Sequence, residues 1–306
     1  MQAQHTDRLT RARESLEGLS VGDAFGQRFF VPPESLVGRV GARWVPPPPW
    51  RFTDDTNMAL SIFSILRQSR EIDRDRLAKS FAERYDGRRG YGPAMHRLLP
   101  RILEGAPWKD AASSLFAGQG SFGNGSAMRV APVGSYFADD LDAAAENARR
   151  SAEVTHAHPE AAAGAIAVAV AAGVAGQLRE SDSIPTRQEF IDRVLPFVPP
   201  SAVHDGVARA RKLLPDTPVR KAVSALGNGS RVTCQDTVPF VLWCAGERLD
   251  NYEEALWLTV SGGGDMDTTC AMVGGIVATY TGADGIPAAW LANREPLPDW
   301  PFEEQV

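Results

Sequence analysis

The sequence predicts an all-α fold in a single domain that spans residues 1–306. Apolar residues recur at helical spacing along most of the chain, and alternating runs of β-branched residues are nearly absent. Short stretches rich in proline and glycine separate the helical segments, and none of them resembles a long flexible linker. With 306 residues, of which 43% are hydrophobic and 23% charged, the chain is long and apolar enough for a large core.

Helical periodicity is clear after the sequence TDDT at 53–56, where one helix face carries Met58, Ile62, Ile65 and Leu66. Further helices are predicted at 7–18, 75–86, 92–104, 108–116, 141–152, 187–195, 203–214, 236–246 and 252–259. The stretch 161–176 has no polar residue, yet it is shorter than the roughly 20 residues that span a bilayer. Because it consists mainly of alanine and glycine, we expect a core helix at the centre of a bundle and no membrane association.

Composition and charge argue against several classes of protein. The net charge of -6, without any run of Lys or Arg longer than a pair, argues against a surface that binds nucleic acid. The cysteines Cys234, Cys244 and Cys270 lack CxxC spacing, so we expect buried free thiols and neither a disulfide framework nor a structural zinc site. The N-terminal residues have no apolar core of a secretory signal. We therefore expect a cytoplasmic protein, and we take it to be a monomer.

Two acidic motifs mark the starts of apolar helices. In TDDT, Thr53 is a good N-cap, and an acidic residue in the first turn interacts favourably with the helix dipole. The interaction with the helix dipole accounts for one aspartate in this turn, but less well for two adjacent ones. In SGGGDMDTT at 261–269, Asp265 and Asp267 flank the start of a helix that is apolar nearly all round, so its acidic N-terminus is expected to be buried or in a cleft.

If the two helix starts meet, their carboxylates form a cluster that needs protons or cations. Charges about 5 Å apart repel by roughly 3 kcal/mol per pair at an effective dielectric constant near 20. Carboxylate and hydroxyl oxygens suit Mg²⁺ or Mn²⁺ better than zinc. The oxygen-bearing residues that could hold two such ions are Thr53, Asp54, Asp55, Asp265, Asp267 and Thr268. The competing interpretation is a pair of helix caps that never meet.

Other motifs are less specific. GQGSFG at 118–123 matches the GxGxxG pattern of dinucleotide-binding folds, but a helical segment precedes it where a strand is required. It remains a glycine-rich loop that could bring backbone amides close to a ribose or phosphate. A lone histidine is more often a hydrogen-bonded structural group than a ligand, but His156 remains a candidate because it directly precedes the apolar core helix. The sequence GNGS occurs at 123–126 and at 227–230, and we interpret both copies as loops.

The order of the motifs resembles that of the ADP-ribosylglycohydrolase family over about residues 12–291. The motifs that carry the resemblance are GLSVGDAFG (18–26), FTDDTNMAL (52–60), RRGYGPAM (88–95), GSFGNGSAMRVAPVG (120–134), THAHPEA (155–161) and GGGDMDTTCAMVGGIVATYTG (262–282). The resemblance implies a compact multi-helix fold that holds a binuclear Mg²⁺ or Mn²⁺ centre. It also implies hydrolysis of the glycosidic bond between ADP-ribose and a modified side chain on a protein, most often arginine in bacterial relatives.

The resemblance also assigns roles to residues. It places metal ligands at the two acidic motifs. Our own hypothesis is that one of these ligands, Asp55 or Asp267, also orients or deprotonates the attacking water. The residues that the resemblance places against ADP-ribose are Gly90, Tyr91, Gly92, Gly120, Ser121, Phe122, Gly123, Asn124 and His156. Of these, Phe122 is suited to packing on the nucleotide, and His156 matches a histidine near the diphosphate.

One position departs from the pattern of the family. Members commonly carry a glutamate seven residues beyond the aspartate of GDAxG, and here that residue is Phe30. Gln27 is the nearest polar isostere and cannot act as a base. Glu34 takes the role, or the metal-bound water suffices, or the protein binds ADP-ribose and hydrolyses it poorly. Hydrolysis of another small ribosyl or phosphate compound is a further alternative.

Overall fold

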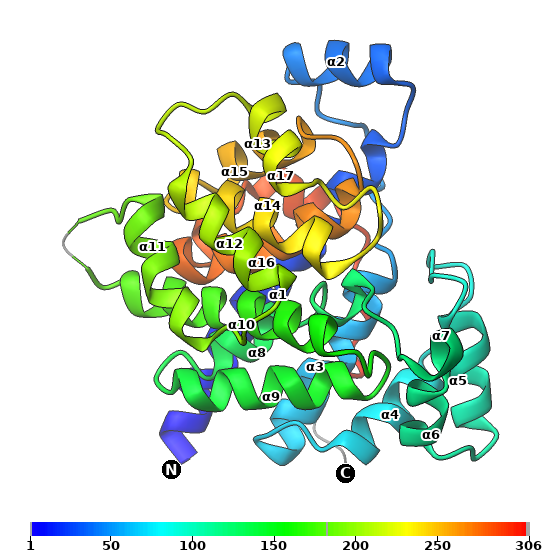
Figure 1. Ribbon diagram of the computed structural model, residues 1–306. Coiled ribbons are helices and arrows are strands. Elements are labelled where there is room, and N and C mark those ends of the chain that lie inside the picture. The colour runs from blue at the N-terminus through cyan, green and yellow to red at the C-terminus, as the bar shows by residue number, and fades with distance from the viewer. Residues whose placement is uncertain (1, 182, 304–306) are drawn as a thin grey trace.

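The computed structural model describes residues 2–181 and 183–303 and confirms the all-α class. Within these residues there are 17 α-helices, four short 3-10 helices and no strand. The α-helices in Figure 1 are α1 Gln2–Gly26, α2 Pro33–Gly41, α3 Asp54–Ser69, α4 Arg74–Glu83, α5 Met95–Leu103, α6 Trp108–Ser113, α7 Leu115–Gly118, α8 Ala131–Tyr136, α9 Leu141–Glu153, α10 Pro159–Leu178, α11 Arg187–Val194, α12 Ala202–Lys212, α13 Val219–Leu226, α14 Cys234–Glu247, α15 Tyr252–Val260, α16 Met266–Thr281 and α17 Ala288–Asn293. The 3-10 helices are η1 Gln27–Phe29, η2 Asn124–Ser126, η3 Leu195–Phe197 and η4 Ala283–Gly285.

The apolar helix α10 lies in the core, as predicted. It packs against α8, α9, α14 and α16, and its alanine and valine side chains are buried from Ala163 to Ala175. In the described part of the chain, α10 is the one helix with the length and apolar composition to cross a membrane, and 83% of its apolar window is buried inside the fold. Burial of this kind is typical of a core helix.

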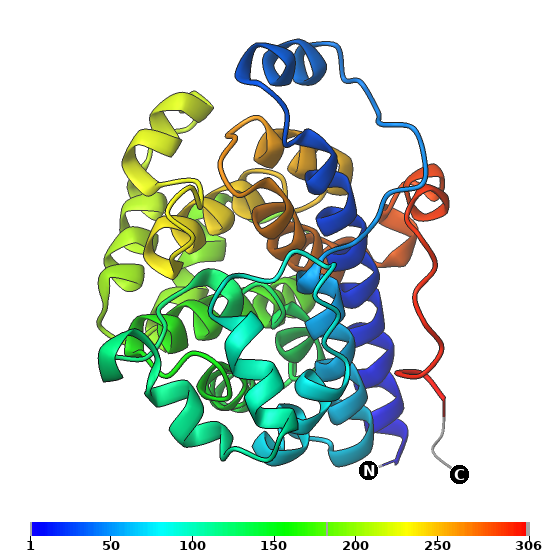
Figure 2. The same ribbon diagram turned by 90° about the vertical axis from the view of Figure 1, so that its right-hand side faces the viewer.

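The helices α1 and α16 pack against each other closely enough for their backbones to touch (Figure 2). A Cβ atom on Gly22 would lie 2.1 Å from the carbonyl oxygen of Cys270, and one on Gly26 would lie 2.2 Å from that of Met266. Side chains at these positions would force the helices apart. The contact brings Asp23, which follows Gly22, against the first turn of α16.

Several helix boundaries differ from the predicted ones. The helix predicted at 108–116 ends at Ser113, because Phe116 and Ala117 adopt left-handed φ angles of 51° and 58°. The helix predicted at 7–18 extends over the whole of α1. Four helices were not predicted, and each has nine residues or fewer and so shows little periodicity: α2, α8, α13 and α17.

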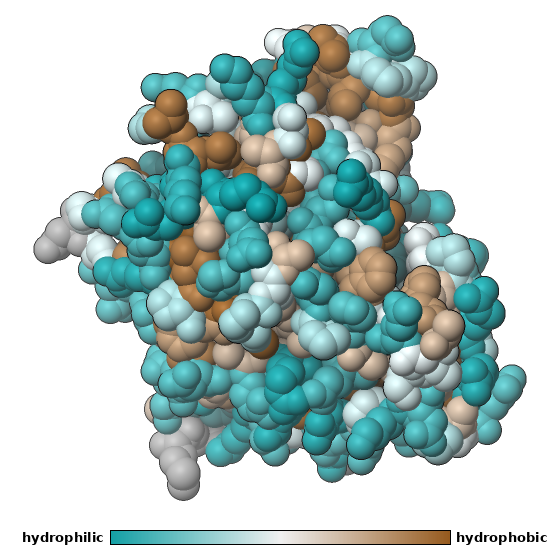
Figure 3. All heavy atoms as spheres, viewed as in Figure 1, coloured by the Kyte–Doolittle hydropathy of each residue, from teal (hydrophilic) through white to brown (hydrophobic). Residues whose placement is uncertain are grey.

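Helix α2 stands apart from the body of the molecule (Figures 1 and 2). None of its residues is buried, and apolar side chains gather over it in Figure 3. The exposed apolar residues on and beside α2 are Phe30, Val37, Trp44 and Val45. A groove of about 600 Å³ separates this arm from the glycine loop before α16, and Phe30, Leu36, Gly263 and Met266 are among its lining residues.

Candidate active site

Three carboxylates from distant parts of the chain meet at one point. Asp23 lies near the end of α1, Asp55 in the first turn of α3 and Asp267 in the first turn of α16. One carboxylate oxygen of each lies within 4.8 Å of the other two. Hence the two acidic helix starts meet, and the interpretation of two separate caps is wrong. We call Asp23, Asp55 and Asp267 the acid triad.

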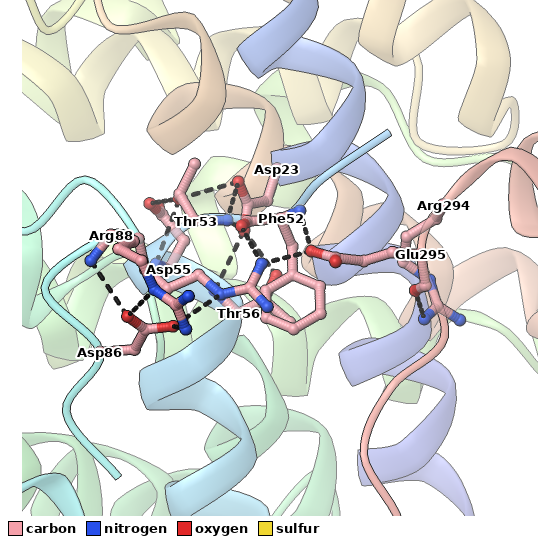
Figure 4. Close-up of polar contacts among 10 residues, drawn as sticks. Asp23, Phe52, Thr53, Asp55, Thr56, Asp86, Arg88, Arg294 and Glu295 are labelled. Atoms are coloured by element: carbon pink, nitrogen blue, oxygen red, sulfur yellow. Dashed lines mark hydrogen bonds and ion pairs between the residues drawn. The ribbon is translucent and has the colours of Figure 1, made fainter. Parts of the chain in front are cut away.

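Asp23 was not predicted as a site residue, although it supports the start of α3 (Figure 4). Its carboxylate accepts hydrogen bonds from the Thr53 backbone N–H at 2.9 Å and from the Thr53 hydroxyl at 2.8 Å. It also accepts from the Thr56 backbone N–H at 3.1 Å and from the Thr56 hydroxyl at 2.5 Å. The helix N-terminus is thus capped by a second helix as well as by Thr53 itself. The spacing of Gly18, Gly22 and Gly26 by four residues was the sequence signal for this contact.

The hydrogen bonds inside the acid triad are incomplete. The Thr53 hydroxyl lies 2.8 Å from Asp23 Oδ1 and 2.8 Å from Asp55 Oδ2, yet it has only one hydrogen to donate. The second oxygen of Asp55, Oδ1, is buried and has no hydrogen-bond partner within the described residues. A buried carboxylate oxygen without a partner is costly, so this position suits a proton or a cation.

Burial and mutual repulsion raise the pKa values of the cluster. Burial raises the pKa of Asp23 to about 6. Burial, together with the charges of Asp23 and Asp265, raises the pKa of Asp54 to about 7. The pKa values of Asp55 and Asp267 rise well above the ordinary value for the same reasons. Without a cation, the cluster therefore retains protons near neutral pH. An all-oxygen donor set of this kind fits Mg²⁺ or Mn²⁺.

The remaining predicted metal ligands surround the triad. Asp54 is partly exposed, and its backbone N–H donates to the Arg89 carbonyl at 2.8 Å. Asp265 precedes α16, and its carboxylate accepts a 2.7 Å hydrogen bond from the Asn124 side chain. Thr268 is buried, and its N–H donates to Asp267 Oδ1 at 2.8 Å. The structure thus brings the six predicted oxygen-bearing residues to the junction of two helix starts.

A segment near the C-terminal end holds the chain just before TDDT. The Phe52 N–H donates to Glu295 Oε1 at 3.0 Å, and Arg89 forms an ion pair with the same carboxylate (Figure 4). The Arg89 guanidinium also lies 4.0 Å from the centre of the Phe52 ring. Sequence reasoning missed Glu295 because nothing near it in the sequence indicates a contact with residue 52.

The predicted loop at 90–92 lies beside the first acidic motif. Gly90 is next to Asp54, since a Cβ on this glycine would lie 3.8 Å from Asp54 Oδ1. Tyr91 is buried, and its hydroxyl accepts a 2.8 Å hydrogen bond from Asn57. Gly92 is exposed. One edge of the loop therefore faces the acidic cluster.

The two GNGS loops lie together and flank Asp265. The Asn124 N–H donates to the Val232 carbonyl at 3.2 Å, which pairs the loop at 123–126 with the segment after the loop at 227–230. The Asn124 side chain holds the Asp265 carboxylate, and the Asn228 carbonyl accepts from the Asp265 N–H at 3.1 Å. Each loop thus supplies one asparagine that positions the start of α16.

The glycine-rich loop that includes Gly120, Ser121 and Phe122 carries an aromatic pair. The Phe122 ring lies 6.3 Å from the Phe116 ring and 5.2 Å from the imidazole of His158, measured between centroids. The Phe116 side chain is 57% exposed on a backbone with a left-handed φ, a conformation that costs energy for a residue with a side chain. Phe116 was expected to lie in a helix and was not predicted as a site residue.

His156 is buried next to the same loop. A Cβ on Gly123 would lie 3.3 Å from its Nε2 atom. Burial and the positive charge of Arg129 lower the pKa of His156 to about 3, so the imidazole is neutral. Contacts therefore connect the acidic cluster with the loop at 120–124 through Asn124, and that loop with His156.

A family model described as ADP-ribosylglycohydrolase matches residues 4–303. The chain belongs to this family. ADP-ribosylhydrolase ARH3 from Homo sapiens is 29% identical over 274 residues, which cover 80% of this chain and 74% of that protein. ADP-ribosylarginine hydrolase Tri1 from Serratia proteamaculans (strain 568) is 24% identical over 300 residues, which cover 94% and 75%.

The fold agrees with the family assignment. A solved structure described as an ADP-ribosylglycohydrolase-related protein complex superposes with a TM-score of 0.60 at 26% sequence identity. The match covers 95% of this chain and 94% of the other. The resemblance inferred from the motifs is thus confirmed, and the site described above belongs to a family of ADP-ribosyl hydrolases.

Phe30 occupies the position at which the motif pattern predicts a glutamate. Its side chain is 49% exposed and lines the groove between the α2 arm and the loop before α16. Gln27 begins η1, directly after α1, and is exposed. Glu34 lies in the first turn of α2 and is exposed on the projecting arm. Glu34 therefore carries the only side-chain carboxylate of the chain between Asp23 and Asp54.

Proposed function

We propose that the protein hydrolyses the glycosidic bond that joins ADP-ribose to a modified arginine side chain of a protein, in the cytoplasm and with two divalent cations, Mg²⁺ or Mn²⁺. The acid triad at the junction of α1, α3 and α16 carries this proposal. One oxygen of each of its carboxylates lies within 4.8 Å of the other two, and Asp55 Oδ1 is a buried oxygen without a partner in the described chain. The residues proposed to hold the cations are Thr53, Asp54, Asp55, Asp265, Asp267 and Thr268. When bound, such cations fix the ribose hydroxyls and activate water.

The carboxylates of the acidic cluster have two roles in this reaction. As the bond to the ribose breaks, positive charge develops on the anomeric carbon, and buried carboxylates stabilise that charge. Asp55 or Asp267 also orients the attacking water or accepts its proton. Asp23 has a supporting task, because it holds Thr53 and Thr56 and thereby fixes the start of α3.

The residues around the acid triad are proposed to hold the nucleotide. Phe122 and Phe116 offer ring faces to the adenine, and the backbone at 120–124 approaches the ribose and phosphates. His156 lies beside this loop, where its imidazole would meet the diphosphate. Gly90, Tyr91 and Gly92 line the side next to Asp54.

The arginine acceptor is supported by the name of the Serratia relative, an ADP-ribosylarginine hydrolase. The test is release of ADP-ribose from a protein modified on arginine and from a peptide modified on serine, with MgCl₂, with MnCl₂ and with EDTA. We expect release from arginine that EDTA abolishes and added cations restore. Undiminished release in EDTA would refute the role of the cations, and release from serine alone would refute the acceptor.

The departure at Phe30 favours a second candidate, a relative that binds ADP-ribose but turns over poorly. Calorimetry that detects ADP-ribose binding, with no release from either substrate, would support it. In that case Phe30→Glu should restore measurable release. If instead Glu34 supplies the missing carboxylate, the wild type releases ADP-ribose and Glu34→Gln abolishes this activity.

A further inference from the structure

The guanidinium of Arg129 is fully buried beside the site and has no carboxylate within ion-pair distance among the described residues. It donates hydrogen bonds to the Ser151 carbonyl at 2.8 Å and to the Thr155 hydroxyl at 2.9 Å. It also lies 4.6 Å from the centre of the Phe81 ring. The charge of Asp54 acts on Arg129 from beyond ion-pair distance, while the hydrogen-bond partners of the guanidinium are neutral. This is unusual, since buried charges are normally paired directly. Its position therefore calls for an explanation beyond packing.

The contacts of Arg129 determine how Thr155 bonds to its neighbour. Arginine has only donors, so the Thr155 hydroxyl must accept from Arg129. The single hydrogen of this buried hydroxyl then needs an acceptor, and the atom at 2.7 Å is Nδ1 of His156. No other acceptor for this hydroxyl lies within hydrogen-bond distance in the described chain. His156 Nδ1 is therefore the acceptor, and the imidazole hydrogen sits on Nε2.

The Nε2 atom of His156 faces the glycine-rich loop. Added Cβ atoms on Gly123 and Gly125 would lie 3.3 Å and 3.2 Å from it, so a side chain at either position would crowd the imidazole. Within residues 2–181 and 183–303, Nε2 makes no hydrogen bond. The His156 residue is 6% exposed, so its Nε2–H is a nearly buried donor without a protein partner. Such a donor suits an oxygen of a bound ligand.

We propose that Arg129 and Thr155 are positioning residues that hold His156 as the neutral Nε2–H tautomer, so that it donates a fixed hydrogen bond to an oxygen of the bound nucleotide. His156 then neither transfers a proton nor carries a charge. The nearby Arg129 cation adds to this effect, since it disfavours a second positive charge on the ring. The identity of the nucleotide as ADP-ribose rests on the proposed function, whereas the tautomer does not.

The tautomer is measurable by NMR on ¹⁵N-histidine-labelled protein with MgCl₂, which is diamagnetic. The chain has five histidines, and His156→Asn identifies the His156 signals by their loss. We expect an unprotonated Nδ1 and a protonated Nε2 that do not change between pH 8 and pH 5. A protonated Nδ1, or a cationic ring at neutral pH, would overturn the proposal whether or not the protein hydrolyses any substrate.

Substitutions at Thr155 test the positioning role. Thr155→Val keeps the side-chain shape but removes the hydroxyl, so we expect a mixture of tautomers and roughly tenfold weaker ADP-ribose binding by calorimetry. Thr155→Ser retains the hydroxyl and should keep both the spectrum and the affinity. If Thr155→Val binds ADP-ribose as tightly as the wild type does, the positioning role is wrong. If the wild type itself does not bind ADP-ribose, the nucleotide of the proposal and the proposed function both fail, while the spectra still decide the tautomer.

Discussion

The two acidic helix starts bring similar residues to the site by different means. At the start of α3, Thr53 caps its own helix and the carboxylate of Asp23 accepts from two residues of that turn. At the start of α16, Asp265 makes no capping bond with its side chain, and two asparagines from the GNGS loops hold it instead. The α3 side is a fixed hydrogen-bonded platform between packed helices, whereas the α16 side depends on loops.

The largest effect is expected for Asp55→Asn, which tests the charge on the α3 side. Asp55 Oδ1 accepts no hydrogen bond within the described structure, so the substitution removes a charge while losing little bonding. We expect kcat/KM to fall on the order of a thousandfold. The melting temperature of the metal-free protein should stay equal or rise, because a neutral amide takes no part in the mutual repulsion that raises the pKa values of the cluster. Asp110→Asn, in the first turn of α6, is the control and should leave kcat/KM unchanged.

Asp23→Asn should separate the supporting carboxylate from the catalytic one. An amide nitrogen would face the N–H and hydroxyl donors of Thr53 or Thr56, so hydrogen bonds at the start of α3 are lost. We expect activity to fall about a hundredfold and the metal-free melting temperature to drop, opposite to Asp55→Asn. Equal changes in the melting temperature of the two variants would contradict a supporting role for Asp23 that is distinct from the catalytic role of Asp55.

The substitution Asn124→Ala tests whether the GNGS loops position the start of α16. This substitution frees the Asp265 carboxylate without removing a charge. We expect kcat/KM to fall roughly tenfold, the loss of about one hydrogen bond to a charged group. The control is Asn251→Ala, which removes the cap of α15 and should cost about 1 kcal/mol of stability with no loss of activity. An unchanged rate in Asn124→Ala would mean that the loops do not position α16.

The smallest effect is a dependence of thermal stability on pH. The pKa values of Asp23, about 6, and Asp54, about 7, lie above those of aspartates in the unfolded chain. Between about pH 4 and pH 7 the folded metal-free protein therefore binds more protons than the unfolded chain does. The contribution of these two carboxyl groups to the free energy of unfolding is fully present at low pH and is lost as the pH rises through this window. MgCl₂ should therefore raise the melting temperature more at pH 8 than at pH 5, relative to EDTA. Equal increases would contradict the buried, proton-retaining cluster.

The sequence predicts what is local about this site. Thr53 as an N-cap and two acidic helix starts follow from capping preferences and apolar periodicity. The contacts of Asp23 and Glu295 depend on residues far away in the sequence, which no local pattern reveals. Phe116 was assigned to a helix because a left-handed backbone at a phenylalanine has no sequence signal. The short helices α2, α8, α13 and α17 were missed for lack of turns to show a period.

The order in which the chain is synthesised determines when the acid triad can form. Asp23 and Asp55 leave the ribosome early, whereas Asp267 on α16 follows only after most of the chain has been made. The triad is complete only when α16 docks on the glycine face of α1. The full repulsion among the three carboxylates therefore arises only when α16 is in place. A fragment that ends before residue 266 would carry two of the three acids and no site.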